Sequence, residues 1–150
     1  MSLPPLPPFA TVFQAIHGHP PYPWQRALAE RVAQGQPWPQ AIGVPTGAGK
    51  TASLDAALYA LAADAGRPAA QQRAPRRIVL VVDRRTVVDQ AYDRAATLRA
   101  ALISAPAGSP VAAVAARLRA LCGDPAPAEP LQISLLRGGV PRDDGWARRP

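Results

Sequence analysis

The segment that most constrains the fold of this chain is the heptapeptide PTGAGKT at positions 45–51. Gly47 and Gly49 let the backbone turn so that successive N–H groups face a common centre, and such a concave loop binds anions. Lys50 adds a compact ammonium group in a chain whose other basic side chains are all arginine. A helix that starts directly after the loop would add the positive end of its dipole. The segment therefore predicts a phosphate-binding loop between a strand and a helix.

The residue types in this loop fit a nucleoside triphosphate with its metal ion. We expect Lys50 to reach the β- and γ-phosphates of ATP and the Thr51 hydroxyl to bind Mg²⁺. The other loop residues expected to contact ATP are Pro45, Thr46, Gly47, Ala48 and Gly49. The strict pattern opens with glycine, whereas Val44 stands at that position and Gly43 comes one residue too early. A glycine turn that precedes a helix and binds nothing is the alternative.

Hydrophobic periodicity predicts helices separated by short apolar runs. Apolar residues at helical spacing mark a turn or helix over 9–16, helices over 23–34 and from about 49 to 65, and helices centred on 88–102 and 111–121. Continuous apolar runs at 41–44, 78–82 and 131–136 have the pattern of buried parallel strands. Strands that alternate with helices predict an α/β fold, a three-layer parallel sheet with right-handed crossovers.

Composition and charge bear on the partners of the chain. Its formal net charge is +7 and its pI is near 11.0, which fits a phosphate-rich partner such as nucleic acid. Arginine enrichment from a GC-rich coding sequence explains the same charge without a partner. One cysteine, Cys122, excludes an internal disulfide. Since the chain also lacks a signal-like leader and an apolar run of about 18 residues, we expect a cytoplasmic protein without membrane contact.

Together with the loop, two further segments resemble the first RecA-like domain of superfamily 2 helicases. Gln25 precedes PTGAGKT, and the segment IVLVVDRR follows it. The resemblance implies a RecA-like P-loop NTPase sheet, present as a partial domain, in which Gln25 reads the adenine edge beside the aromatic Tyr22. A side-chain amide can both donate to and accept from adenine. The alternative is a solvated Gln25 on a surface helix, with Tyr22 and Trp24 packed in the core.

The amino-acid sequences of several segments are similar to those of one branch of these enzymes. PYPWQ, PTGAGKT, VLVVDRRTVVDQA and LRGG followed by RDDGWARRP resemble the N-terminal part of the type I CRISPR-associated helicase of the I-U (or I-G) kind. This resemblance implies ATP-dependent DNA unwinding or translocation, with single-stranded DNA, a CRISPR effector complex and a separate nuclease as partners. It also implies a truncated ATP-binding domain over residues 21–150, while the proline-rich start of the chain predicts an extended lead-in over residues 1–20.

The same resemblance implies two contacts with single-stranded DNA. Arg84 and Arg85 follow the predicted strand 78–82 and match the first strand-gripping motif of the family. Arg137, Gly138 and Gly139 match a later motif in which glycine N–H groups approach DNA phosphates. A surface arginine pair and an ordinary Gly-Gly turn are the alternatives.

Some parts of a complete motor are not identifiable in the chain. A motor needs an acidic pair after a later strand and arginines from a second RecA-like domain. Asp143 and Asp144 lie in a Gly- and Arg-rich stretch without a preceding apolar strand. His17 and His19 have no matching carboxylate cluster and are expected to lie in a loop. We therefore expect no ATP hydrolysis by the chain alone; a P-loop kinase or an inactive nucleotide-binding remnant are the alternatives.

Overall fold

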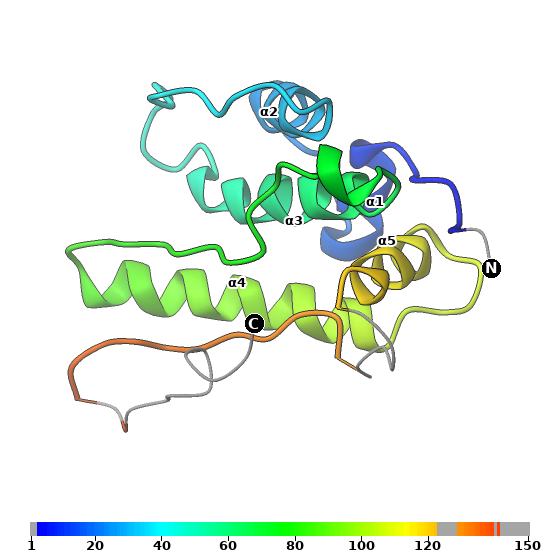
Figure 1. Cartoon of the computed structure of the whole chain (residues 1–150). Helices are drawn as coiled ribbons and strands as arrows, with labels where there is room; N and C mark the ends of the chain where they lie inside the picture. Colours follow the sequence, from blue (N-terminus) through cyan, green and yellow to red (C-terminus); the bar gives the residue numbers. More distant parts are fainter. Residues whose placement is uncertain (1–2, 123–128, 140, 142–150) are drawn as a thin grey trace.

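The structure, a computed structural model, describes residues 3–122, 129–139 and 141 and is helical throughout its regular part (Figure 1). The α-helices are α1 (Phe9–His17), α2 (Pro23–Ala33), α3 (Ser53–Asp64), α4 (Arg85–Ile103) and α5 (Pro110–Ala120). Two short 3₁₀-helices, η1 (Lys50–Ala52) and η2 (Ala69–Gln71), lie between them. None of the described helices is long and apolar enough to cross a membrane.

The predicted parallel α/β sheet of a RecA-like domain is wrong, because the described residues contain no strand. The runs 41–44, 78–82 and 131–136 are extended segments outside any strand (Figure 1). Val79 is 77% exposed and Val81 is 85% exposed, whereas a central parallel strand is covered on both faces. An apolar run becomes a strand only when other strands bind its backbone. Here the helices instead bury their apolar faces against one another.

The helices predicted from periodicity are confirmed, with ends set by local residues. Gly18 takes a left-handed conformation, φ 77°, directly after α1. Pro23 is the first residue of α2, where its missing N–H has no helical partner to lose. The Ser109 hydroxyl accepts a hydrogen bond of 3.1 Å from the Ala112 N–H and caps α5. These local signals explain why helix positions follow from the sequence.

The hydrophobic core is centred on α1, which contacts each of the other four α-helices. The Phe9 ring lies 5.6 Å from the Phe13 ring and 5.3 Å from the Tyr59 ring, measured between centroids. The second pair is edge-to-face and the first is tilted, and such contacts between aromatic rings are favourable at these distances. α2 packs on α3, and α5 closes the other side against α1, α3 and α4. The largest buried apolar side chains are Phe9, Phe13, Leu28, Leu58, Tyr59, Leu61, Leu98, Leu102 and Leu118.

Backbone carbonyls of the N-terminal segment, residues 3–8, are bound by two core side chains. The Tyr59 hydroxyl donates to the Pro7 carbonyl at 2.8 Å. Arg117, which is 8% exposed, donates to the carbonyls of Pro4 at 2.6 Å and of Ala62 at 2.7 Å. A buried guanidinium is tolerated when its donors are bonded. The proline-rich segment is thus attached to α3 and α5.

Candidate nucleotide-binding site

The glycine loop leads directly into a helix, as predicted, but no strand precedes it among the described residues. Gly47 and Gly49 have φ of 82° and 70°, the left-handed region that favours glycine. The Ala48 N–H donates to the Pro45 carbonyl at 3.3 Å, and the Ala52 N–H donates to the Gly49 carbonyl at 3.0 Å. The loop therefore makes a compact turn immediately before η1 and α3.

Two side chains from the first turn of α2 bind the carbonyl groups of this loop. The Trp24 indole N–H donates to the Ala48 carbonyl at 3.0 Å. The Gln25 amide donates to the Gly49 carbonyl at 3.1 Å, and its oxygen accepts the Tyr22 N–H at 2.9 Å. Gln25 is only 3% exposed. It is therefore neither a solvated surface residue nor an open polar group, but a buried link between the cap of α2 and the loop.

The side chains of Lys50 and Thr51 fit the phosphate and metal roles predicted for them. The exposed Lys50 ammonium bends back over the loop and donates to the Pro45 carbonyl at 3.2 Å. The Thr51 hydroxyl has no hydrogen-bond partner among the described residues, and the N–H groups of Lys50 and Thr51 begin η1. N–H groups at a helix start and an ammonium group can bind phosphate oxygens, and a hydroxyl oxygen can coordinate Mg²⁺.

Tyr22 lies at the same loop. Two of its ring carbons are 3.6 and 3.7 Å from the position that a Cβ on Gly49 would take. Its side chain is 53% exposed, so Tyr22 does not pack in the core. The structure thus brings together Tyr22, Gln25 and the loop, which are separated by about two dozen residues in the sequence.

The residues predicted to contact DNA do not lie at a sheet edge, since the described residues form no sheet. Arg84 is the extended residue before α4, and Arg85 is its first residue. Arg137 pairs with Asp89 of α4, with its Nε at 2.8 Å from the carboxylate. The Arg85 guanidinium lies 3.9 Å from the position that a Cβ on Gly138 would take.

The two predicted DNA-contacting segments therefore meet at the N-terminal end of α4, although about 50 residues separate them in the sequence. Gly139, with φ of 85°, continues the second segment in a conformation that favours glycine. The family motif that continues with Asp143 and Asp144 lies outside the described residues.

A buried polar cluster was not anticipated from the sequence. His17 Nε2 lies 2.6 Å from the Asp55 carboxylate, and Arg94 Nε lies 2.6 Å from the other carboxylate oxygen. His17 is the last residue of α1, not a loop residue, and its ring packs 4.4 Å from that of Phe13. Asp55, an acidic residue within the apolar pattern of α3, was the sequence signal that could have indicated the cluster. Because the three side chains are bonded to one another, the cluster joins α1, α3 and α4.

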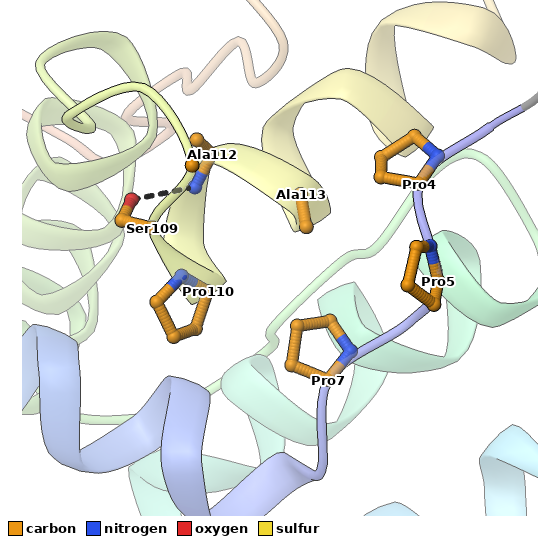
Figure 2. Close-up of a pocket in the computed structure, with 8 residues that line it drawn as sticks. Pro4, Pro5, Pro7, Ser109, Pro110, Ala112 and Ala113 are labelled. Carbon is orange, nitrogen blue, oxygen red and sulfur yellow. Dashed lines mark hydrogen bonds between the residues drawn. The ribbon is translucent and has the colours of Figure 1, made fainter.

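A separate hollow of about 370 Å³ lies between the N-terminal prolines and α5 (Figure 2). Ser109 carries the one polar side-chain atom among its lining residues, and that hydroxyl already caps α5. The hollow is lined otherwise by proline, glycine and alanine, whose side chains carry no polar atom. It lies apart from the glycine loop, none of whose residues line it.

Comparisons of the chain with protein-family models, with curated proteins and with solved structures found no match.

Proposed function

We propose that this chain binds Mg·ATP at loop 45–51 and is the ATP-binding part of an ATP-dependent DNA helicase or translocase. The observation that carries the proposal is the attachment of the loop to α2, through Trp24 and Gln25, at the point where a helix begins. A turn without a ligand does not need two glycines in left-handed conformation, a cation across its mouth and a free hydroxyl beside it. These features occur together here.

The expected roles follow from the chemistry of each group. The backbone N–H groups of the loop and the Lys50 ammonium would bind the phosphate oxygens, because the positive ends of N–H dipoles and an ammonium charge both attract anions. The Thr51 hydroxyl would hold Mg²⁺, which neutralises phosphate charge when bound. Tyr22 would stack on the base.

The DNA-binding part of the proposal rests on charge at the start of α4. Arg84 and Arg85 are exposed there, and Arg137 lies within reach of the same end of the helix. Arginine side chains bind backbone phosphates of single strands without reading the bases. The resemblance to the CRISPR-associated helicase extends this proposal to antiviral interference in the cytoplasm, with an effector complex and a separate nuclease as partners.

Nucleotide binding is tested by thermal unfolding with and without Mg·ATP. A ligand that binds only the folded state at 100 times its Kd stabilises it by about 2.7 kcal/mol, which raises the Tm of a chain of this size by roughly 5–11 °C. Lys50→Ala should remove most of this shift. Arg76→Ala is the matched control, because it also removes one exposed cation, which has no partner among the described residues.

The proposal is refuted if Mg·ATP leaves the Tm of the unmodified chain unchanged at millimolar concentration. It is refuted as well if Lys50→Ala and Arg76→Ala respond alike. DNA binding is tested separately, by the loss of single-strand affinity in Arg84→Ala with Arg85→Ala, and by a decrease of affinity with salt.

A further inference from the structure

We infer that Trp24 and Gln25 are positioning residues of the phosphate site, which orient the loop so that it binds a polyphosphate chain whatever base is attached. This inference rests on the proposed function, because it concerns how the same loop recognises its ligand. Trp24 thereby has a role at the site, and Gln25 is expected to contact the loop and not the base.

The geometry of the peptide bond links these side chains to the ligand. In a planar trans peptide the C=O and the following N–H point in opposite directions. Trp24 holds the Ala48 carbonyl, so the Gly49 N–H points away from α2. Gln25 holds the Gly49 carbonyl, so the Lys50 N–H points away from α2 as well. Two adjacent N–H groups therefore face the side of the loop opposite to α2, where a phosphate can bind them.

The engagement of Gln25 argues against direct reading of adenine. Its oxygen accepts the Tyr22 N–H and its nitrogen donates to the Gly49 carbonyl, while the side chain is almost fully buried. A base reader must present a free acceptor and a free donor to the ring edge. Turning Gln25 toward a base would leave the loop carbonyl and the cap of α2 without partners. Such unpaired groups are costly.

The close packing at Gly49 supports the same role. A Cβ on Gly49 would lie 2.7 Å from the Gln25 nitrogen, so the side chain and the loop backbone are in direct contact. A Cβ on Gly47 would meet no atom within 4 Å. The loop is therefore supported on its α2 side and open on the other.

The ligand class that follows is any linear polyphosphate with Mg²⁺, including ATP, GTP and inorganic tripolyphosphate. Tyr22 is the one residue of the predicted contact set that would touch the base, and stacking on an aromatic ring tolerates every base. The base would add affinity without selectivity.

The test compares the three ligands by calorimetric titration of the full chain. Trp24→Phe keeps an aromatic ring and removes the indole N–H, whereas Gln25→Leu keeps the approximate size and removes the amide. Each change should weaken the binding of ATP, GTP and tripolyphosphate by the same factor, about tenfold. This factor corresponds to about 1.4 kcal/mol, the size of the one hydrogen bond to a loop carbonyl that each change removes. Trp38→Phe and Gln14→Leu, at exposed positions, are the matched controls and should leave all three affinities unchanged.

A spectroscopic readout separates positioning from general structure. In ¹⁵N spectra of the ligand-free variants, the amide signal of Gly49 should move most in Trp24→Phe and that of Lys50 most in Gln25→Leu. Signals of α5 should stay in place. A purely structural role would disturb the core instead. Trp24→Phe leaves the cap of α2 intact, so it decides the question even where Gln25→Leu does not fold.

Two results overturn the inference while leaving the proposed function in place. One is a loss of ATP affinity in Gln25→Leu without loss for GTP or tripolyphosphate, which would show that Gln25 reads the base. The other is unchanged affinity for all three ligands in Trp24→Phe. Failure of the unmodified chain to bind any of the three ligands refutes the proposed function and this inference together.

Discussion

Replacing Asp64 by asparagine, a single-atom exchange at the end of α3, should destabilise the fold strongly. Asp64 is the last residue of α3 and is 2% exposed. Its carboxylate accepts hydrogen bonds from the Arg73 N–H at 2.6 Å, from the Ala74 N–H, and from the Arg67 guanidinium. Arg67 also donates to the Ala33 carbonyl at 2.6 Å, so the carboxylate ties α3 to the end of α2 and to the following loop.

The magnitude follows from the bonds that asparagine cannot make. The N–H groups of Arg73 and Ala74 bind the same carboxylate oxygen, so an amide oxygen placed there retains both as weaker neutral bonds, and the bond from Arg67 is lost. Hydrogen bonds to a charged group contribute about 1.5–3 kcal/mol each and neutral ones about 0.5–1.5 kcal/mol, so one lost bond and two weakened ones would amount to about 3–6 kcal/mol. Because the Arg67 side chain is 27% exposed and water can replace part of its bond, we expect about 3 kcal/mol. For a chain of this length this corresponds to a fall in Tm of roughly 6–12 °C.

The assay is urea unfolding followed by far-ultraviolet circular dichroism, with Tm measured on the same samples. Asp93→Asn is the matched control, since it removes the same charge from an exposed carboxylate with no partner among the described residues. The reasoning is refuted if the unfolding free energies of Asp64→Asn and Asp93→Asn agree within about 0.5 kcal/mol, the usual effect of surface substitutions.

Three further predictions concern single groups. Gly49→Ala should lower the free energy of unfolding by at least about 1 kcal/mol more than Gly47→Ala does. Both glycines have positive φ, but only at Gly49 does the new Cβ clash with a neighbour, Gln25. Ser109→Ala should cost about 1 kcal/mol through loss of the cap of α5, measured by urea unfolding. Burial, aided by the Glu30 carboxylate, raises the pKa of Tyr59 above its ordinary 10.0. The stability that this hydroxyl contributes is therefore complete below about pH 10 and falls as pH rises further. Tyr59→Phe should lose less unfolding free energy at alkaline pH than the unmodified chain.

Each of these has a defined contrary result. Equal unfolding free energies for Gly47→Ala and Gly49→Ala would show that the loop is not pressed against α2. A Ser109→Ala variant as stable as the unmodified chain would mean that α5 does not depend on its cap. For the alkaline effect, Tyr92→Phe is the control, because Tyr92 is exposed. The explanation fails if both tyrosine variants lose stability equally between pH 9 and pH 11.

The candidate site could be predicted only in part. The loop residues with Lys50 and Thr51 were expected from the motif, and the proximity of Tyr22 and Gln25 to the loop was implied by the helicase resemblance; the structure brings these groups together. The hydrogen bond from Trp24 to the loop was not expected, because an aromatic residue at helical spacing usually indicates a core residue. The available signal was its position next to Gln25 in the first turn of a helix. The binding of ATP itself stays a prediction.

The sequence by itself determined the helices and the turn at the loop. Helical hydrogen bonds join residues four apart, so periodicity, capping residues and glycine positions act within one or two turns of the chain. Strands depend on partners that are distant in sequence. The apolar runs 41–44, 78–82 and 131–136 therefore predicted a sheet that the described residues do not form. Tertiary structure alone decided that these runs stay extended, that Asp55 and Asp64 find buried partners, and that α2 binds the loop carbonyls, because each depends on contacts between segments far apart in the chain.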